Sequence, residues 1–206
     1  MDVVVVDYGM GNLRSVHKAL ERVGCNASIS SDPAAISTAS RLVLPGVGHF
    51  AKGMANLDSR GLLGVLNQRV LEAQVPVLGI CLGLQLMSRH SEEGDCNGLG
   101  WIDADTVKFD FSTSSKPLRV PHIGWNTLNV DSGSSLLSTV AGHDSFYFTH
   151  SFHLARCAAE IRAATTTYGE SFVSAIQAGN LFGTQFHPEK SHKRGLDLLR
   201  RFVEAD

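Results

Sequence analysis

The sequence lacks the long apolar runs, basic blocks and secretion signals that mark several classes of protein. Its 206 residues include no uninterrupted apolar stretch of the roughly 18 residues that a membrane helix requires. The valine-rich start, residues 1–7, has acidic flanks and no positively charged region of the kind that begins a signal peptide. The net charge is −2, and without a lysine- or arginine-rich block we expect no nucleic acid and no membrane surface as partner. These absences predict a cytoplasmic protein.

Cysteine is scarce and widely spaced. The four cysteines are Cys25, Cys81, Cys96 and Cys157, and no two of them form a C-x-x-C pair. A disulfide framework or a thiolate metal site is therefore not expected, and a single reactive thiol is the more interesting hypothesis. The histidines at positions 49, 90, 122, 143 and 192 have no spacing typical of metal ligands. We expect neither a metal nor an organic cofactor.

Strands and helices alternate through the first half of the chain. The run Val3–Val6 is β-branched throughout, as in a strand buried on both faces of a parallel sheet. A helix follows, with Asn12 as a plausible N-cap and Gly24 as its stop. Further strands are predicted at residues 27–30, 41–44 and 75–80, and further helices near 62–71 and 82–87. This alternation is typical of a right-handed, mostly parallel α/β sheet.

The second half changes character. Short strands separated by turn signals are predicted between residues 101 and 130, with an exposed loop tip at 112–115. Strands recur at 145–152, 161–167, 172–177 and 181–186, and a last helix carries Leu196, Leu199, Phe202 and Val203 on one face. We therefore predict one domain, residues 1–206. Its fold is α/β, with a mostly parallel central sheet flanked by helices and an additional smaller antiparallel or mixed sheet region.

The strongest local motif is Gly79-Ile80-Cys81-Leu82-Gly83, between a predicted buried strand and a predicted helix. It has the G-x-nucleophile-x-G form of a nucleophile elbow, in which the glycines relieve crowding around a sharp turn. The N-terminus of the adjoining helix favours a thiolate and offers N–H groups to a developing oxyanion. Taken alone, the pentapeptide is equally compatible with Cys81 as a small buried core residue.

A cysteine nucleophile needs a base, and His187-Pro188-Glu189 follows the predicted strand 181–186. His187 would then emerge at a strand end, as Cys81 does. A carboxylate two residues later can orient the imidazole ring and stabilise its protonated form. Any one of nine histidines is a weak candidate by itself. Its occurrence together with the elbow makes the pair a candidate catalytic site.

Cys81 in Gly-Ile-Cys-Leu-Gly-Leu-Gln, followed by His187-Pro-Glu189, resembles the triad of class I glutamine amidotransferases. Within that family, further segments resemble the glutaminase subunit of imidazole glycerol phosphate synthase. They are Asp7-Tyr-Gly-Met-Gly-Asn-Leu-Arg-Ser-Val16, Leu44-Pro-Gly-Val-Gly48, Pro121-His-Ile-Gly-Trp-Asn126, Tyr147-Phe-Thr-His-Ser151 and Phe186-His-Pro-Glu-Lys-Ser191. These segments span almost the whole chain. The first and third are the more specific, whereas the elbow and His-Pro-Glu are shared across the superfamily.

The resemblance implies a mechanism. Cys81 would attack the carboxamide carbon of glutamine, and His187 would protonate the departing ammonia and then help water to hydrolyse the thioester, with Glu189 holding its ring. The oxyanion donors would be the N–H of Leu82 and the Gly46-Val47-Gly48 loop. Because glycine-flanked peptides can swing, this hole is expected to form only in an activated state.

The resemblance also assigns residues to the substrate and to a partner. Gln85, four residues after Cys81 and on the same helix face, would bind glutamine, although the residue by itself could be a helix-surface side chain. The backbone of His150, Ser151 and Phe152 would hold the amino-acid end of the substrate. The residues expected to face the partner are Tyr8, Asn12, Arg14, Trp125, Tyr147 and Lys190. Core packing is the alternative for Trp125 and Tyr147, a helix cap for Asn12, and solvated charge for Arg14 and Lys190.

The partner would be the cyclase subunit, a (β/α)8 barrel, in a heterodimer of histidine biosynthesis. It would use the ammonia to form imidazole glycerol phosphate. Three alternatives stay open: a free-standing cysteine hydrolase such as a γ-glutamyl hydrolase or peptidase, the glutaminase subunit of another synthase, and a non-catalytic module with an inert Cys81. Partner-independent hydrolysis would indicate the first, and slow alkylation of the thiol would indicate the last.

Overall fold

The computed structural model describes residues 2–112 and 118–205. The strands are β1 (Asp2–Val6), β2 (Asn26–Ser30), β3 (Arg41–Gly46), β4 (Val77–Cys81), β5 (His90–Ser91), β6 (Cys96–Asn97), β7 (Asp105–Lys108), β8 (His122–Thr127), β9 (Asn129–Val130), β10 (Ser145–His150), β11 (Phe152–Ala155), β12 (Arg162–Tyr168), β13 (Glu170–Ala178) and β14 (Leu181–Thr184). The α-helices are α1 (Leu13–Arg22), α2 (Pro33–Thr38), α3 (Phe50–Ser59), α4 (Leu62–Asn67), α5 (Leu82–Leu86) and α6 (His192–Glu204). A π-helical turn, η1 (Gln68–Glu72), continues α4, and η2 (Ala159–Ile161) and η3 (Pro188–Lys190) are 3₁₀ turns.

One long sheet runs through the molecule. Its order is β2-β1-β3-β4-β14-β13-β11-β7-β5-β6, and the strands from β2 to β14 are parallel. From β13 to β7 the pairing is antiparallel, and β12 and β9 branch from β13. Most of the antiparallel strands thus prolong the parallel sheet. Among the strands of the described residues, only β8 and β10 form a separate small sheet.

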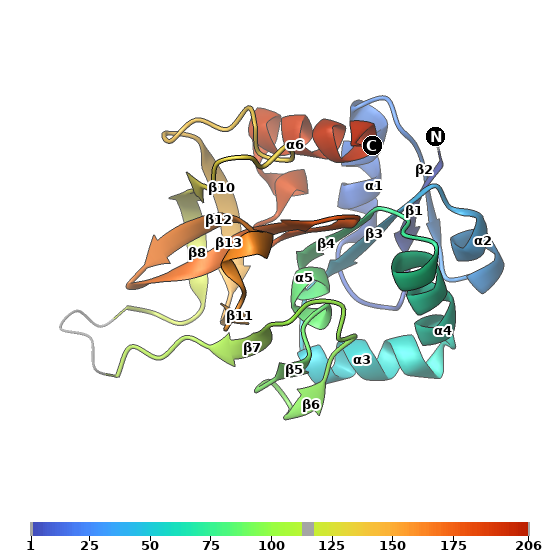
Figure 1. Cartoon of the computed structure of the whole chain (residues 1–206), viewed down its shortest axis with the longest axis horizontal. Coiled ribbons are helices and arrows are strands. Elements are labelled where there is room, and N and C mark those ends of the chain that lie inside the picture. Colours follow the sequence, from blue (N-terminus) through green and yellow to red (C-terminus); the bar gives the residue numbers. More distant parts are fainter. Residues whose placement is uncertain (1, 113–117, 206) are drawn as a thin grey trace.

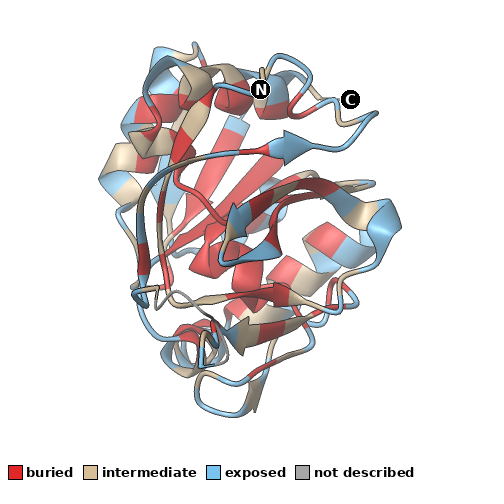
Figure 2. Cartoon of the chain, turned by 90° about the vertical axis from the view of Figure 1, so that its left-hand side faces the viewer, coloured by how far each residue is buried: buried red, intermediate tan, exposed pale blue. Residues whose placement is uncertain are grey.

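Helices cover both faces of the parallel strands, with α1 and α6 on one side and α3, α4 and α5 on the other (Figure 1). Alternation of side chains along β1 explains why a continuous valine run is needed there. Val3 and Val5 pack into one core with α1 and α6, whereas Val4 and Val6 pack into the other. Figure 2 accordingly shows the buried residues gathered in the central strands.

The predicted ends of α1 agree with the structure. The Asn12 side chain accepts a hydrogen bond from the Ser15 N–H at 3.4 Å, and Gly24 has φ of +84°, a conformation in which glycine commonly ends a helix. The helix predicted at 62–71 is present but changes from α to π geometry at Gln68. The loop tip predicted at 112–115 lies, except for residue 112, outside the described residues.

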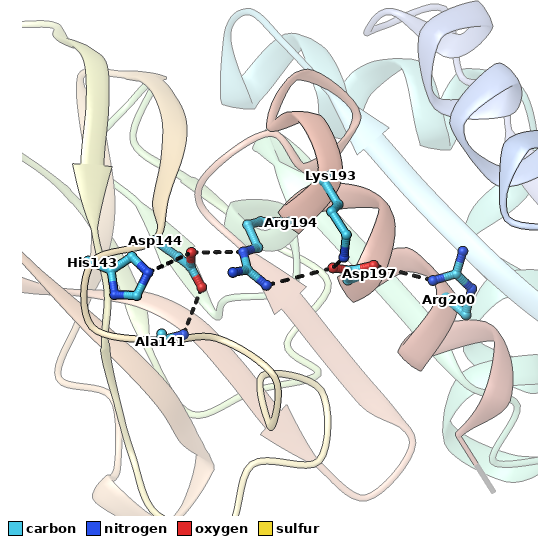
Figure 3. A network of polar contacts seen from close by, with 7 residues as sticks. All are labelled: Ala141, His143, Asp144, Lys193, Arg194, Asp197 and Arg200. Atoms are coloured by element: carbon cyan, nitrogen blue, oxygen red, sulfur yellow. Dashed lines mark hydrogen bonds and ion pairs between the residues drawn. The ribbon is translucent and has the colours of Figure 1, made fainter.

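Polar contacts tie α6 to the segment before β10 (Figure 3). The buried Asp144 carboxylate accepts hydrogen bonds from Ala141 N–H at 2.8 Å and from Arg194 Nε of α6 at 2.7 Å. Farther along α6, Asp197 pairs with Lys193 at 2.7 Å and with Arg200 at 3.3 Å. The Arg194–Asp144 contact thus joins α6 to the segment before β10, whereas the Asp197 pairs lie within the helix. Within the described ranges, no helix is long and apolar enough to cross a membrane.

Candidate functional site

The turn from β4 into α5 places Cys81 at the carboxyl end of a central strand. Cys81 has φ of +54°, a conformation that non-glycine residues seldom adopt and that is common at functional sites. A Cβ on Gly79 would lie 2.7 Å from the Leu84 nitrogen, and one on Gly83 would overlap the carbonyl oxygen of Leu44 in β3. Both glycines of the elbow are therefore required by the backbone packed around them.

His187 and Glu189 lie at the end of the neighbouring parallel strand. β14 pairs with β4, and His187 follows β14 by three residues. Its Nδ1 donates a hydrogen bond to Glu189 Oε1 at 2.9 Å, and both side chains are only 2% exposed. The second nitrogen, Nε2, is buried and has no hydrogen-bond partner among the described residues. Because Nδ1 is occupied by Glu189, Nε2 is the nitrogen left to exchange a proton.

The electrostatics of His187 depend on its two neighbours. Burial lowers the pKa of the imidazole, but the nearby Cys81 and Glu189 outweigh burial and raise the pKa to about 9. The ring is therefore protonated at pH 7, and the Glu189 carboxylate beside it stabilises the charge. The structure thus brings together the three residues that the sequence predicts as a triad.

A cavity of about 330 Å³ opens beside Cys81. Its walls are formed by Val47, Gly48, Cys81, Leu82, Gln85, Glu93, Pro121, Thr149, His150, Ser151 and Phe152. They include the predicted nucleophile, the four residues predicted to bind substrate, and all the predicted oxyanion residues except Gly46. His187 and Glu189 do not line the cavity; they lie behind Cys81, at the end of the neighbouring strand β14.

Gln85 and Gln185 connect the cavity to the nucleophile. Gln85 Nε2 donates to Phe152 O at 2.8 Å and to Gln185 Oε1 at 3.1 Å. Gln185 Nε2 in turn points at Cys81 Sγ, 3.6 Å away. Gln185 is not among the residues predicted from the sequence. Its position two residues before His187, at the end of a strand, was the available signal, because side chains two apart share a face.

Comparison with known proteins agrees with this arrangement. A family model described as glutamine amidotransferase class-I matches residues 4–205. The chain belongs to this family. It is 42% identical to imidazole glycerol phosphate synthase subunit HisH 2 from Methanococcus maripaludis, over 98% of each chain. It is 44% identical to subunit HisH from Moorella thermoacetica, covering 98% of this chain and 94% of the relative.

A solved structure resembles this amidotransferase over nearly its whole length. The crystal structure of a glutamine amidotransferase matches with a TM-score of 0.73, covering 98% of this chain and 97% of the other. The two sequences are only 20% identical, so this likeness supports the fold alone. It agrees with the predicted class, a mostly parallel central sheet flanked by helices with a smaller antiparallel sheet.

A buried histidine pair supports the cavity wall of this amidotransferase. His150 Nδ1 donates to Phe152 O at 2.8 Å, so its Nε2 must accept, and it does so from His122 Nδ1 at 3.1 Å. Burial lowers the pKa of His150 to about 3 and that of His122 to about 4. Both rings are therefore neutral at pH 7. Together they hold the backbone at residues 150–152, which the sequence predicts to contact the substrate.

The predicted oxyanion loop, which begins beside Cys81, forms another part of the cavity wall. Gly46 is the last residue of β3 and pairs in register with Cys81, whereas Val47 and Gly48 are exposed. Gly48 has φ of +113°, which favours glycine. Tyr8 was predicted to face a partner, and that prediction is wrong for this structure. Its side chain is fully buried against Gly46 and Leu82, because the bulk of the ring fills the core beneath the loop.

Other residues predicted to face a partner form part of an exposed surface, here called the β8–β10 surface and made of Ile123, Trp125, Tyr147, Lys190 and His192. Trp125 stacks on His192 with 5.0 Å between ring centroids, and Lys190 Nζ lies 5.5 Å from the centroid of the Tyr147 ring. Ile123 is 61% exposed and Trp125 is 47% exposed. Large apolar side chains left this open are typical of contact surfaces.

Asn12 and Arg14 are the remaining two residues predicted to face a partner. Both are exposed at the start of α1. α1 contacts η3, the turn that carries Lys190 of the β8–β10 surface. In the part of the chain that the structure describes, no group of three or more His, Cys, Asp or Glu side chains is arranged to hold a metal ion.

Proposed function

We propose that this amidotransferase hydrolyses glutamine to glutamate and ammonia through a thioester on Cys81. The observation that carries the proposal is the junction of the Cys81 elbow, the buried His187–Glu189 pair and the adjoining cavity of about 330 Å³. The Cys81 thiolate attacks the side-chain carboxamide carbon, and His187 donates its proton to the leaving nitrogen, which departs as ammonia. Water then attacks the thioester carbon while His187 accepts a proton from it, and cleavage of the C–S bond releases glutamate and regenerates the Cys81 thiolate and the protonated His187.

The oxyanion that forms in each step needs N–H donors beside Cys81. We assign this role to the backbone of Leu82 and to the Gly46–Val47–Gly48 loop, because these segments flank Cys81 in space. The exposure of Val47 and Gly48 leaves their peptides room to rotate. A loop of this kind can complete the donor pair when a partner or ligand covers it.

The cavity fits the amino-acid end of glutamine. Both amide hydrogens of Gln85 are occupied by protein acceptors, which leaves its Oε1 to accept a hydrogen bond from a ligand. The carboxylate of Glu93 also lines the cavity and suits the α-ammonium group of an amino acid. Main-chain groups at residues 150–152 would complete the contacts.

We further propose that the ammonia passes to the cyclase subunit of imidazole glycerol phosphate synthase. The relatives at 42–44% identity carry the name of a subunit of this synthase. The β8–β10 surface, with Asn12 and Arg14 beside it, is the proposed docking face. It adjoins the cavity, since Pro121 and Thr149 line the cavity within two residues of Ile123 and Tyr147. Such a heterodimer would supply histidine biosynthesis, and we infer that residues 1–206 act in it as one domain.

Release of glutamate from glutamine tests the proposal. The rate is measured for the chain alone and with the cyclase subunit and its ligand, and strong stimulation is expected. Cys81→Ala should abolish the activity while leaving the fold intact. Cys157→Ala is the matched control, because burial raises the pKa of that thiol to about 11 and the residue lies outside the cavity. Full activity in Cys81→Ala would overturn the proposal, and rapid hydrolysis without a partner would indicate a free-standing hydrolase.

A further inference from the structure

Gln185 is a fully buried polar residue that the proposed mechanism does not use. It follows β14, and its backbone N–H donates to Ser174 O of β13 at 2.9 Å. The alternation along this segment puts Gly183, Gln185 and His187 on the face that α5 covers, and a Cβ on Gly183 would in fact meet Leu84 of α5. The side-chain amide is therefore directed between the nucleophile and the cavity.

The direction of the hydrogen bonds around Gln185 is fixed by a main-chain carbonyl. Phe152 O can only accept, so Gln85 must turn its nitrogen toward it, at 2.8 Å. The second hydrogen on that nitrogen then requires an acceptor, which is Gln185 Oε1 at 3.1 Å. Gln185 Nε2 is left as the atom that faces Cys81 Sγ, 3.6 Å away. Turning the amide over would oppose two N–H donors, those of Gln85 and Gln185, at the Gln85 end.

We propose that Gln185 is a positioning residue that donates a hydrogen bond to the Cys81 thiolate and holds the sulfur at the mouth of the cavity. A thiolate accepts such a bond more strongly than a thiol does, so the donor favours the reactive form. The bond also links the nucleophile to the wall of the cavity, because the same amide orients Gln85. This role rests on the proposed function of Cys81 as the nucleophile.

The ionisation of Cys81 gives a test that needs neither glutamine nor a partner. The rate of Cys81 alkylation by iodoacetamide is followed from pH 5 to pH 10 in the full chain, with peptide mass spectrometry separating Cys81 from the other three cysteines. Gln185→Met keeps the length of the side chain and removes the donor. We expect the midpoint of the pH profile to rise by about one pH unit. In Gln185→Glu a second anion faces the sulfur, and the midpoint should rise further.

The control is Gln68→Met, the same change at an exposed residue of η1, which should leave the midpoint unchanged. Thermal unfolding establishes which variants are folded, and Gln185→Glu replaces Gln185→Met if the latter is not. A folded variant with the wild-type midpoint would overturn the proposal. A raised midpoint in Gln185→Met, together with no glutamate release by the unsubstituted chain even with the cyclase subunit and its ligand, would uphold the role of Gln185 and refute the proposed glutaminase.

Discussion

Two walls of the cavity beside Cys81 differ in how tightly they are packed. On one side, the elbow at residues 79–83 is buried, and a Cβ on either of its glycines would meet backbone atoms. On the other, residues 47–49 are exposed, and a Cβ on Gly48 would meet only the methyl end of the Met10 side chain. The nucleophile is thus fixed by close packing, whereas the loop beside it has space to change its backbone conformation.

This difference in packing matches the different demands that the proposed reaction places on the nucleophile and on the oxyanion donors. A nucleophile and its base must be held within a few tenths of an ångström to react, and dense packing supplies that precision. Oxyanion donors are needed only once charge develops, so their loop can stay open until a partner covers it. The contrast therefore predicts that substitutions in the elbow act on stability and chemistry together, and that those around the loop act weakly on the free protein.

Gly83→Ala should have the largest effect on the packed wall, lowering both stability and activity. Its Cβ would overlap Leu44 O of β3, so either the strand or α5 must shift. We expect the free energy of unfolding to fall by about 3 kcal/mol or more. Displacement of Cys81 should also lower the glutaminase rate by about a hundredfold. Denaturant titration and the rate of glutamate release measure the two effects.

Gly64→Ala is the matched control, since Gly64 lies in α4 and nothing is within 4 Å of its Cβ position. That change should stabilise the protein by about 0.5–1 kcal/mol, because alanine restricts the unfolded chain. Equal effects of the two substitutions would mean that the elbow can relax, and the contrast between the two walls would then be lost.

The packed side is also the part that local sequence patterns predict best. The valine run of β1, the cap at Asn12 and the elbow glycines all express short-range rules, and the structure agrees with each of them. The antiparallel strands were predicted near their observed places. That they prolong the main sheet could not be predicted, because strand pairing is decided by contacts far apart in sequence.

Glu189→Gln tests the electrostatic part of the packed side. The amide can still contact the ring but no longer stabilises its charge, so the glutaminase rate should fall by about a hundredfold. Loss of the proton carrier in His187→Ala should cost more, about a thousandfold or more. A larger loss in Glu189→Gln than in His187→Ala would mean that the roles of the two residues are wrongly assigned.

The same pair makes stability depend on pH. The pKa of His187 is raised to about 9 in the folded protein, against about 6.5 in an unfolded chain. The protonated ring therefore adds stability that is fully present below pH 6.5 and is lost as the pH rises through 9. In Glu189→Gln, which removes the carboxylate that stabilises the charged ring, denaturant titrations at pH 6, 7.5 and 9 should show a smaller loss. An equal loss in both proteins would indicate that Glu189 does not hold the charge.

The residues around the cavity show which features could not be predicted from local sequence patterns. Gln185 was not predicted because its proposed role depends on contacts with Gln85 and Cys81, each about a hundred residues away in the chain. Tyr8 was assigned to a partner surface because motif position says nothing of which way a ring points. Burial decides that, and it follows from how β1, β3 and α5 meet beneath Gly46.

Tyr8→Phe is expected to have the smallest effect, and it probes the point where the two walls meet. The hydroxyl lies against Gly46 at the base of the loop, and it has no hydrogen-bond partner among the described residues. Burial, with a smaller contribution from Cys81, raises the pKa of this phenol, so the group stays neutral. Removing an unpaired buried hydroxyl should stabilise the free protein by about 1 kcal/mol, or roughly 2–4 °C in Tm.

Tyr168→Phe supplies the opposite case, because the Tyr168 hydroxyl donates to Arg119 O at 2.8 Å. That variant should lose about 0.5–1.5 kcal/mol. If Tyr8→Phe also lost stability, the Tyr8 hydroxyl would have to be hydrogen-bonded in solution, and the loop would be tied to the core rather than resting on it. A gain for Tyr8→Phe together with a loss for Tyr168→Phe would show that the base of the loop is held by contact alone, as the open wall of the cavity requires.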